Sequence, residues 1–95
     1  MNVIKRTIPV TELLAGLAEE ASEVAQAALK LRRVFDQTNP TPMKEEEALE
    51  KFYEEIADVH LYLQVIDVPW NYIDEIIDRK RERWKDRLKE RSKTE

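Results

Sequence analysis

The sequence predicts an all-α protein, a helical bundle of three long helices per chain that oligomerisation completes. Only one glycine, Gly16, occurs among the 95 residues, and the four prolines fall where helices begin or are separated. Apolar residues recur at helical spacing over three long segments, without an alternating strand pattern or a glycine-rich phosphate loop. We expect a single domain over residues 1–95 with a core at about 12–91. A chain of this size buries a modest share of its surface alone, which favours self-association.

The first helix is expected from about residue 12 to residue 35. Thr11 suits its N-cap, with Pro9 just upstream. At about 100° per residue, one apolar stripe forms, with Glu20 on its shoulder and Glu23 and Glu19 successively farther round. The stripe consists of Leu13, Leu17, Ala21, Val24, Ala28, Leu31 and Phe35.

The second helix should follow the break "DQTNPTP" at 36–42 and run to about Ile66. Thr41 and Pro42 form a suitable cap and first-turn pair. Glu55 borders the apolar stripe and Asp58 follows on the same side, where the helix is apolar nearly all round. Asp58 is therefore expected to be the acid that is hardest to leave in water. The stripe consists of Leu49, Phe52, Ile56, Val59, Leu63 and Ile66.

The third helix is expected from about Trp70 to Arg91, after "DVP" at 67–69. Lys80 and Arg87 project from within its apolar arc, and Arg83 from the edge of that arc. Buried or half-buried cations need partners, because isolated charges in a low-dielectric core cost several kcal/mol. The expected partners are acids or phosphates. The stripe consists of Ile73, Ile76, Ile77, Trp84 and Leu88, so Trp84 is predicted to be a core residue.

Three other aromatic or histidine side chains near the third helix receive structural interpretations. His60, the only histidine, is expected to be a hydrogen-bonded structural residue rather than a catalytic base. Trp70 and Tyr72 begin the third helix, and we expect them to pack at its junction or at a dimer contact.

The charge distribution limits the class of partner. The net charge is −4, acidic residues dominate the first two thirds of the chain, and residues 79–93 are mostly basic. The overall acidity argues against a nucleic-acid binder, and the basic segment can answer the protein's own carboxylates or a phosphate held between them. The chain contains no cysteine, no membrane-spanning apolar run and no signal-peptide core, so we expect a soluble, cytoplasmic protein without a membrane partner.

Two pairs of acidic residues indicate a metal site. Glu20 with Glu23, and Glu55 with Asp58, are each spaced i,i+3, so each pair projects from one helical face. Packed across a helix pair, they would form an oxygen shell suited to Mg²⁺, which shares its shell with substrate phosphates. The same acids could be the polar flank of amphipathic helices, and both interpretations stay open at this point. A di-iron site is excluded, because it needs two ExxH pairs and the chain has one histidine.

A family resemblance covers most of the chain, about residues 12–91. "EEASE" at 19–23 and "EIAD" at 55–58 resemble the EExxE…ExxD signature of the all-α nucleoside triphosphate pyrophosphohydrolases, the MazG-like superfamily. "KRERWKDR" at 80–87 resembles the KxxKNxxR region of its third motif, with Trp84 where many relatives carry asparagine.

The resemblance implies magnesium-dependent hydrolysis between the α and β phosphates of a nucleoside triphosphate, giving a monophosphate and pyrophosphate. Homodimers or homotetramers are usual in the family. Phosphoribosyl-ATP pyrophosphohydrolase is an alternative within the enzyme class, and a non-catalytic helical interaction protein is an alternative outside it. The implied metal ligands are Glu20, Glu23, Glu55 and Asp58; Glu19 is a ligand or the catalytic group that orients or deprotonates water; Lys80, Arg83 and Arg87 bind phosphate.

Overall fold

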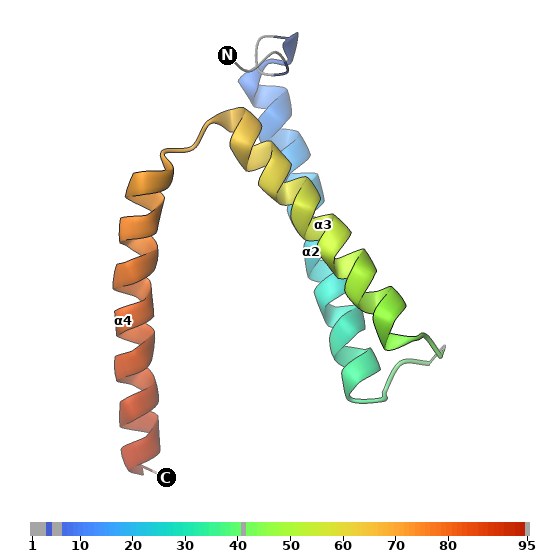
Figure 1. Ribbon diagram of the computed structural model, residues 1–95, viewed down its shortest axis with the longest axis vertical. Helices are drawn as coiled ribbons and strands as arrows, with labels where there is room; N and C mark the ends of the chain where they lie inside the picture. The colour runs from blue at the N-terminus through green and yellow to red at the C-terminus, as the bar shows by residue number, and fades with distance from the viewer. Residues whose placement is uncertain (1–3, 5–6, 41, 95) are drawn as a thin grey trace.

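The computed structural model describes residues 4, 7–40 and 42–94, and three long helices account for most of these residues. These are α2 (Val10–Phe35), α3 (Glu45–Ile66) and α4 (Trp70–Thr94), and the described residues contain no strand. Helices α2 and α3 lie side by side as an antiparallel hairpin, while α4 stands apart from them (Figure 1). The prediction of an all-α chain with three long helices is confirmed.

The starts of the first two helices differ from the predicted ones. Helix α2 begins at Val10, because the Pro9 carbonyl accepts hydrogen bonds from the amides of Glu12 and Leu13 at 3.0 and 3.1 Å. Thr11 therefore lies inside the helix, and its prediction as N-cap was wrong. Helix α3 begins at Glu45 with Lys44 as N-cap, later than Pro42 suggested, and Thr41 lies outside the described residues. Three glutamates occupy the first turn of α3, where the helix dipole favours negative charge.

The core lies between α2 and α3 and is small. Its buried apolar residues are Leu13, Ala27, Leu31, Ala48 and Val65. The predicted stripe of α2 is buried at Leu13 and Leu31. In α3, however, the buried face is turned away from Ile56, which is exposed, and toward Glu55, which is buried. The two helices thus meet along a face that includes an acidic side chain.

The single glycine marks a close approach between the helices of the hairpin. A Cβ atom added at Gly16 would lie 2.5 Å from the Cε1 and Oη atoms of Tyr62. Such a distance is shorter than van der Waals contact, so the phenol ring occupies the space that any other residue at position 16 would need. The glycine in α2 therefore allows Tyr62 of α3 to lie against the α2 backbone.

Gly16→Ala is expected to destabilise the protein despite the better helix propensity of alanine. Alanine gains about 1 kcal/mol of propensity, but overpacking costs about 1–3 kcal/mol because the Tyr62 ring must turn away. Urea unfolding monitored by circular dichroism would measure the difference. In the double variant Gly16→Ala/Tyr62→Leu, the space is vacated and the alanine should become neutral or stabilising relative to Tyr62→Leu alone. A Gly16→Ala variant more stable than wild type would contradict the close packing.

Helix α4 does not close a bundle within one chain. Helices α2 and α3 form the extensive helix–helix contact of the described residues, and α4 diverges from them (Figure 1). The Cα radius of gyration is 17.6 Å, whereas a compact domain of this length has about 12–13 Å. The single chain is therefore a hairpin carrying a separate helix.

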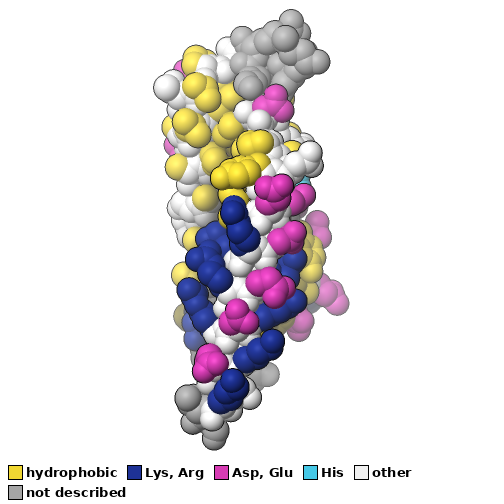
Figure 2. Space-filling view, turned by 90° about the vertical axis from the view of Figure 1, so that its left-hand side faces the viewer, with side chains coloured by type: hydrophobic (Ala, Val, Ile, Leu, Met, Phe, Trp, Pro, Cys, Tyr) yellow, Lys and Arg dark blue, Asp and Glu magenta, His cyan; other side chains and the backbone are white. Residues whose placement is uncertain are grey.

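The separation of α4 changes the surroundings of its side chains. Trp84 is 66 % exposed, so its prediction as a core residue was wrong. Lys80, Arg83 and Arg87 are also exposed rather than half-buried. Figure 2 looks onto this helix and shows rows of Lys and Arg side chains with acidic side chains between them. Of the apolar arc that the sequence predicts for α4, Ile73 and Ile76 are half-buried, whereas Ile77, Trp84 and Leu88 are exposed.

The connection between α3 and α4 is short and carries an aromatic contact. Asp67 adopts the left-handed conformation, with φ 73°, and ends α3. The rings of His60 and Trp70 stack across this turn, with centroids 5.4 Å apart and 29° between the ring planes. The prediction that Trp70 packs at the junction is confirmed. His60 makes a ring contact there rather than the expected hydrogen bond, and Tyr72 is exposed.

Candidate metal centre

Three acidic side chains from the two helices of the hairpin converge. Glu20 of α2 and Glu55 and Asp58 of α3 each offer a carboxylate oxygen, and these oxygens all lie within 4.8 Å of one another. The antiparallel packing of α2 and α3 places position 20 opposite the pair at 55 and 58. We call these three residues the acidic cluster. It contains three of the four metal ligands that the family resemblance implied.

The burial of the cluster is graded from inside to outside. Glu55 is 5 % exposed, Glu20 is half-buried, and Asp58 is exposed. The prediction that Asp58 would be the least solvated acid was wrong, because the buried face of α3 is turned toward Glu55. The cluster therefore has an anchored carboxylate at its base and an accessible one at its mouth.

Lys51 holds the buried carboxylate. Its Nζ atom lies 2.7 Å from Oε1 of Glu55, one helical turn away on α3. The hydrogen bond and the charge of Glu55 raise the pKa of Lys51, and Glu54 and Glu23 add to this effect. Sequence reasoning missed Lys51, although its i,i+4 spacing from Glu55 is a signal for a helical ion pair.

Glu20 experiences the negative charge of the whole cluster. Its pKa is raised above the ordinary value of 4.5, first by desolvation and then by the charges of Asp58, Glu55 and Glu23. A hydrogen bond with Asp58 also favours the protonated form. The structure thus places Glu23 within electrostatic reach of Glu20, but outside the three-residue cluster. A cation among these carboxylates would relieve their repulsion.

The raised pKa of Glu20 predicts a pH dependence of stability in EDTA. A carboxyl group with a raised folded-state pKa stabilises the fold at pH values below its unfolded pKa of about 4.5. That contribution is lost as the pH rises through the folded-state pKa. We therefore expect Glu20→Gln to remove this part of the decline and to raise Tm at pH 7 without metal. Thermal unfolding between pH 4 and pH 7 checks this; identical pH profiles for both proteins would contradict it.

The two remaining acids of the first motif, Glu19 and Glu23, lie outside the acidic cluster. Glu19 and Glu23 lie on α2 beside Glu20, and both are exposed. Neither belongs to the acidic cluster of the described residues. Glu23 is near enough to influence Glu20 and Lys51, so it can take part at the outer edge of the site.

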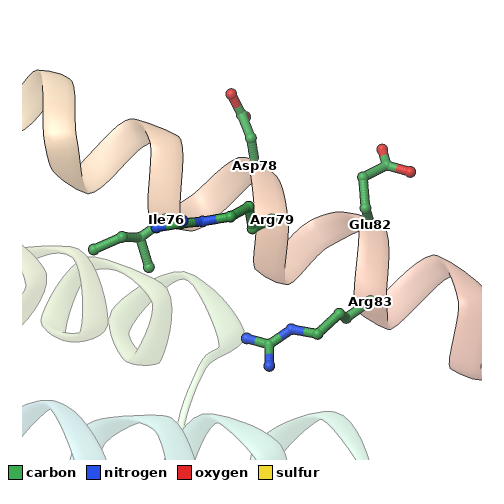
Figure 3. Close-up of a pocket in the computed structure, with 5 residues that line it drawn as sticks. All are labelled: Ile76, Asp78, Arg79, Glu82 and Arg83. Atoms are coloured by element: carbon green, nitrogen blue, oxygen red, sulfur yellow. The ribbon is translucent and has the colours of Figure 1, made fainter.

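The structure does not bring the predicted phosphate-binding residues to the acidic cluster. Lys80, Arg83 and Arg87 lie on α4, and no ion pair in the described part of the chain joins them to an acid of α2 or α3. Arg83 lines a surface hollow along α4 with Ile76, Asp78, Arg79 and Glu82 (Figure 3). In that view Ile76 and Arg83 extend to one side of the helix, and the two acids extend to the other.

The residues present fit a hard divalent cation. All three members of the cluster offer carboxylate oxygen, the donor type that Mg²⁺ prefers. Glu55 already holds a cation, the Lys51 ammonium group. The exposure of Asp58 leaves one side of the cluster open to water or to a phosphate ligand. The three carboxylates could therefore hold a divalent cation from one side and leave its other side accessible.

Comparison with known proteins adds no support to the family resemblance. Neither a protein-family model, nor a curated protein, nor a solved structure matches this chain significantly. The resemblance to the MazG-like superfamily therefore rests on the segments 19–23, 55–58 and 80–87. The first two of these segments supply the acidic cluster. No helix in the described part of the chain is both long enough and apolar enough to span a bilayer.

Proposed function

We propose that this protein is a magnesium-dependent nucleotide pyrophosphohydrolase of the MazG-like type. It would cleave a nucleoside triphosphate between the α and β phosphates, releasing a monophosphate and pyrophosphate, as in the removal of unwanted nucleotides. The observation that carries this proposal is the convergence of Glu20, Glu55 and Asp58 from two helices. The order of the two acidic motifs along the chain supports the same reaction. The absence of cysteine fits a cytoplasmic enzyme.

The proposed role of each acidic side chain follows from its burial and its position in the site. Glu55 is fixed at the base of the site, and Glu20 and Asp58 complete the oxygen set that would hold Mg²⁺. When bound, the ion supplies charge neutralisation at the phosphates and a lowered pKa for an attacking water. Glu23 stands at the outer edge of the site. Glu19 is a further ligand or the group that orients or deprotonates water.

The cations of α4 would neutralise the phosphates that extend beyond the metal. Lys80 and Arg87 are the main residues for this role, with Arg83 beside them. Because α4 stands apart in the single chain, an assembly must bring these cations and the acidic cluster to a common substrate. We assign that step to self-association as a homodimer or homotetramer, in which a second copy covers the apolar arc of α4.

Pyrophosphate release tests the proposed function. The protein is assayed with canonical and modified nucleoside triphosphates and with phosphoribosyl-ATP, first with magnesium and then with EDTA. We expect release from at least one nucleoside triphosphate that EDTA abolishes and excess magnesium restores. Release from phosphoribosyl-ATP alone would identify the alternative enzyme of histidine synthesis. A folded oligomer that releases no pyrophosphate from any of these compounds would contradict the proposal and favour a helical interaction protein.

A further inference from the structure

The ion pair between Lys51 and Glu55 lies inside the site and has no part in the reaction described above. Counted over side-chain atoms alone, Lys51 is 58 % exposed and Glu55 is 7 % exposed. Glu55 is the buried charged residue of the described chain, and a buried carboxylate without a partner is costly. Lys51 therefore neutralises the residue that anchors the acidic cluster.

The ammonium group can leave Glu55 without disturbing the core. More than half of the Lys51 side chain is exposed to solvent, so Lys51 is not part of the core. Glu54 and Glu23 also act on Lys51 electrostatically, so other carboxylates surround it. Glu23 is exposed on α2, and its negative charge also attracts the ammonium group. Displaced from Glu55, the ammonium group would thus remain at the solvent-exposed surface of α3.

We propose that Lys51 is a resident counter-cation of the metal centre, which holds Glu55 in the absence of metal and is displaced when a divalent cation binds. This inference rests on the proposed function, because it requires the acidic cluster to bind metal. The ion must then break the 2.7 Å contact before it can use Glu55 fully. Lys51 keeps the empty site folded and neutralised, and it lowers the affinity of that site for metal.

Calorimetric titration with Mn²⁺ tests the role of Lys51. The full chain is compared with Lys51→Gln, with Lys51→Arg, and with Lys30→Gln as a matched loss of one positive charge elsewhere on the hairpin. We expect Lys51→Gln to bind Mn²⁺ about fivefold more tightly, in keeping with the modest strength of a helical ion pair. Lys51→Arg and Lys30→Gln should remain near wild type. Without metal, Lys51→Gln should have the lower Tm.

The possible outcomes separate this inference from the proposed function. If wild type binds Mn²⁺ and Lys51→Gln binds it equally or more weakly, Lys51 is not a competing cation, although the metal site stands. If no variant binds Mn²⁺, both proposals fail. A gain in affinity that disappears in 1 M salt, where the screening length is about 3 Å, would show a long-range charge effect instead of a displaced contact.

Discussion

Glu55→Gln is expected to abolish magnesium-dependent pyrophosphate release and the stabilisation of the protein by magnesium. The substitution keeps the size of the buried side chain but removes the anchored charge of the acidic cluster. Changes in the outer shell of metal sites already cost about 10–100-fold, so loss of a ligand should lower release at least about a hundredfold. At a magnesium concentration tenfold above Kd, binding stabilises wild type by about 1.4 kcal/mol. Thermal unfolding with and without magnesium measures its loss.

The neighbouring residue supplies the control for this experiment. Glu54 is exposed and lies outside the acidic cluster, so Glu54→Gln removes the same charge from the adjacent position. It should retain the magnesium shift and most of the activity. Equal helicity of the two variants by circular dichroism would exclude misfolding as the cause. A Glu55→Gln protein that still gains stability from magnesium would place the metal elsewhere.

Trp84→Ala is expected to dissociate the proposed homo-oligomer. Trp84 is the most exposed large hydrophobic side chain of α4, and Leu88 and Ile77 flank it along the same helix at 50 % and 41 % exposure. Tryptophan dominates many interfaces, where its truncation costs at least about 2 kcal/mol. The dissociation constant should therefore rise at least about thirtyfold. Sedimentation velocity over a range of protein concentrations would detect the change.

A charged neighbour controls for general effects of substitution on α4. Lys85 pairs with Glu82 on the exposed surface of the helix, at 3.2 Å. Lys85→Ala removes this surface contact and leaves Trp84 in place, so the oligomer should persist. If wild type sediments as a monomer at every concentration, self-association through α4 is wrong. The proposed assembly of the site would then require closure of α4 onto its own chain.

Composition and the positions of helix-breaking residues were enough to predict the three helices. The scarcity of glycine favoured long helices, the break at 36–42 separated the first two, and the end of α3 at Ile66 followed from "DVP". The start of α2 could not be predicted as well. Pro9 and Thr11 can each stand at a helix start, and the choice depends on which carbonyl accepts the first hydrogen bonds.

The residues of the acidic cluster could be predicted from the sequence, but the burial of each residue could not. The i,i+3 spacing predicts that each acidic pair shares one helical face. In the structure, Glu20, Glu55 and Asp58 do come together. Which acid becomes buried depends on how far α3 rotates about its axis against α2. That rotation depends on how the side chains of the two helices fit together, including the contact of Gly16 with Tyr62. A helical projection of one segment does not contain this information.

The placement of α4 shows a different limit. Its amphipathic pattern predicts that one face needs a cover, but the pattern is the same whether the cover is the chain's own hairpin or another molecule. The basic residues on the helix were predicted to be half-buried because Lys80 and Arg87 project from within its apolar arc and Arg83 from the edge of that arc. They are exposed because α4 does not pack along the hairpin in the single chain.

The separation of α4 from the hairpin also bears on how such a protein can change. Substitutions in parts that share few contacts have nearly additive effects on stability. Variation in the basic helix is therefore tolerated by the hairpin that carries the acidic cluster, and variation in the hairpin core leaves the helix intact. Selection can therefore alter the charges of α4 independently of the carboxylates of the hairpin. A small chain of this design can diverge in the charge of one helix while the hairpin keeps its fold.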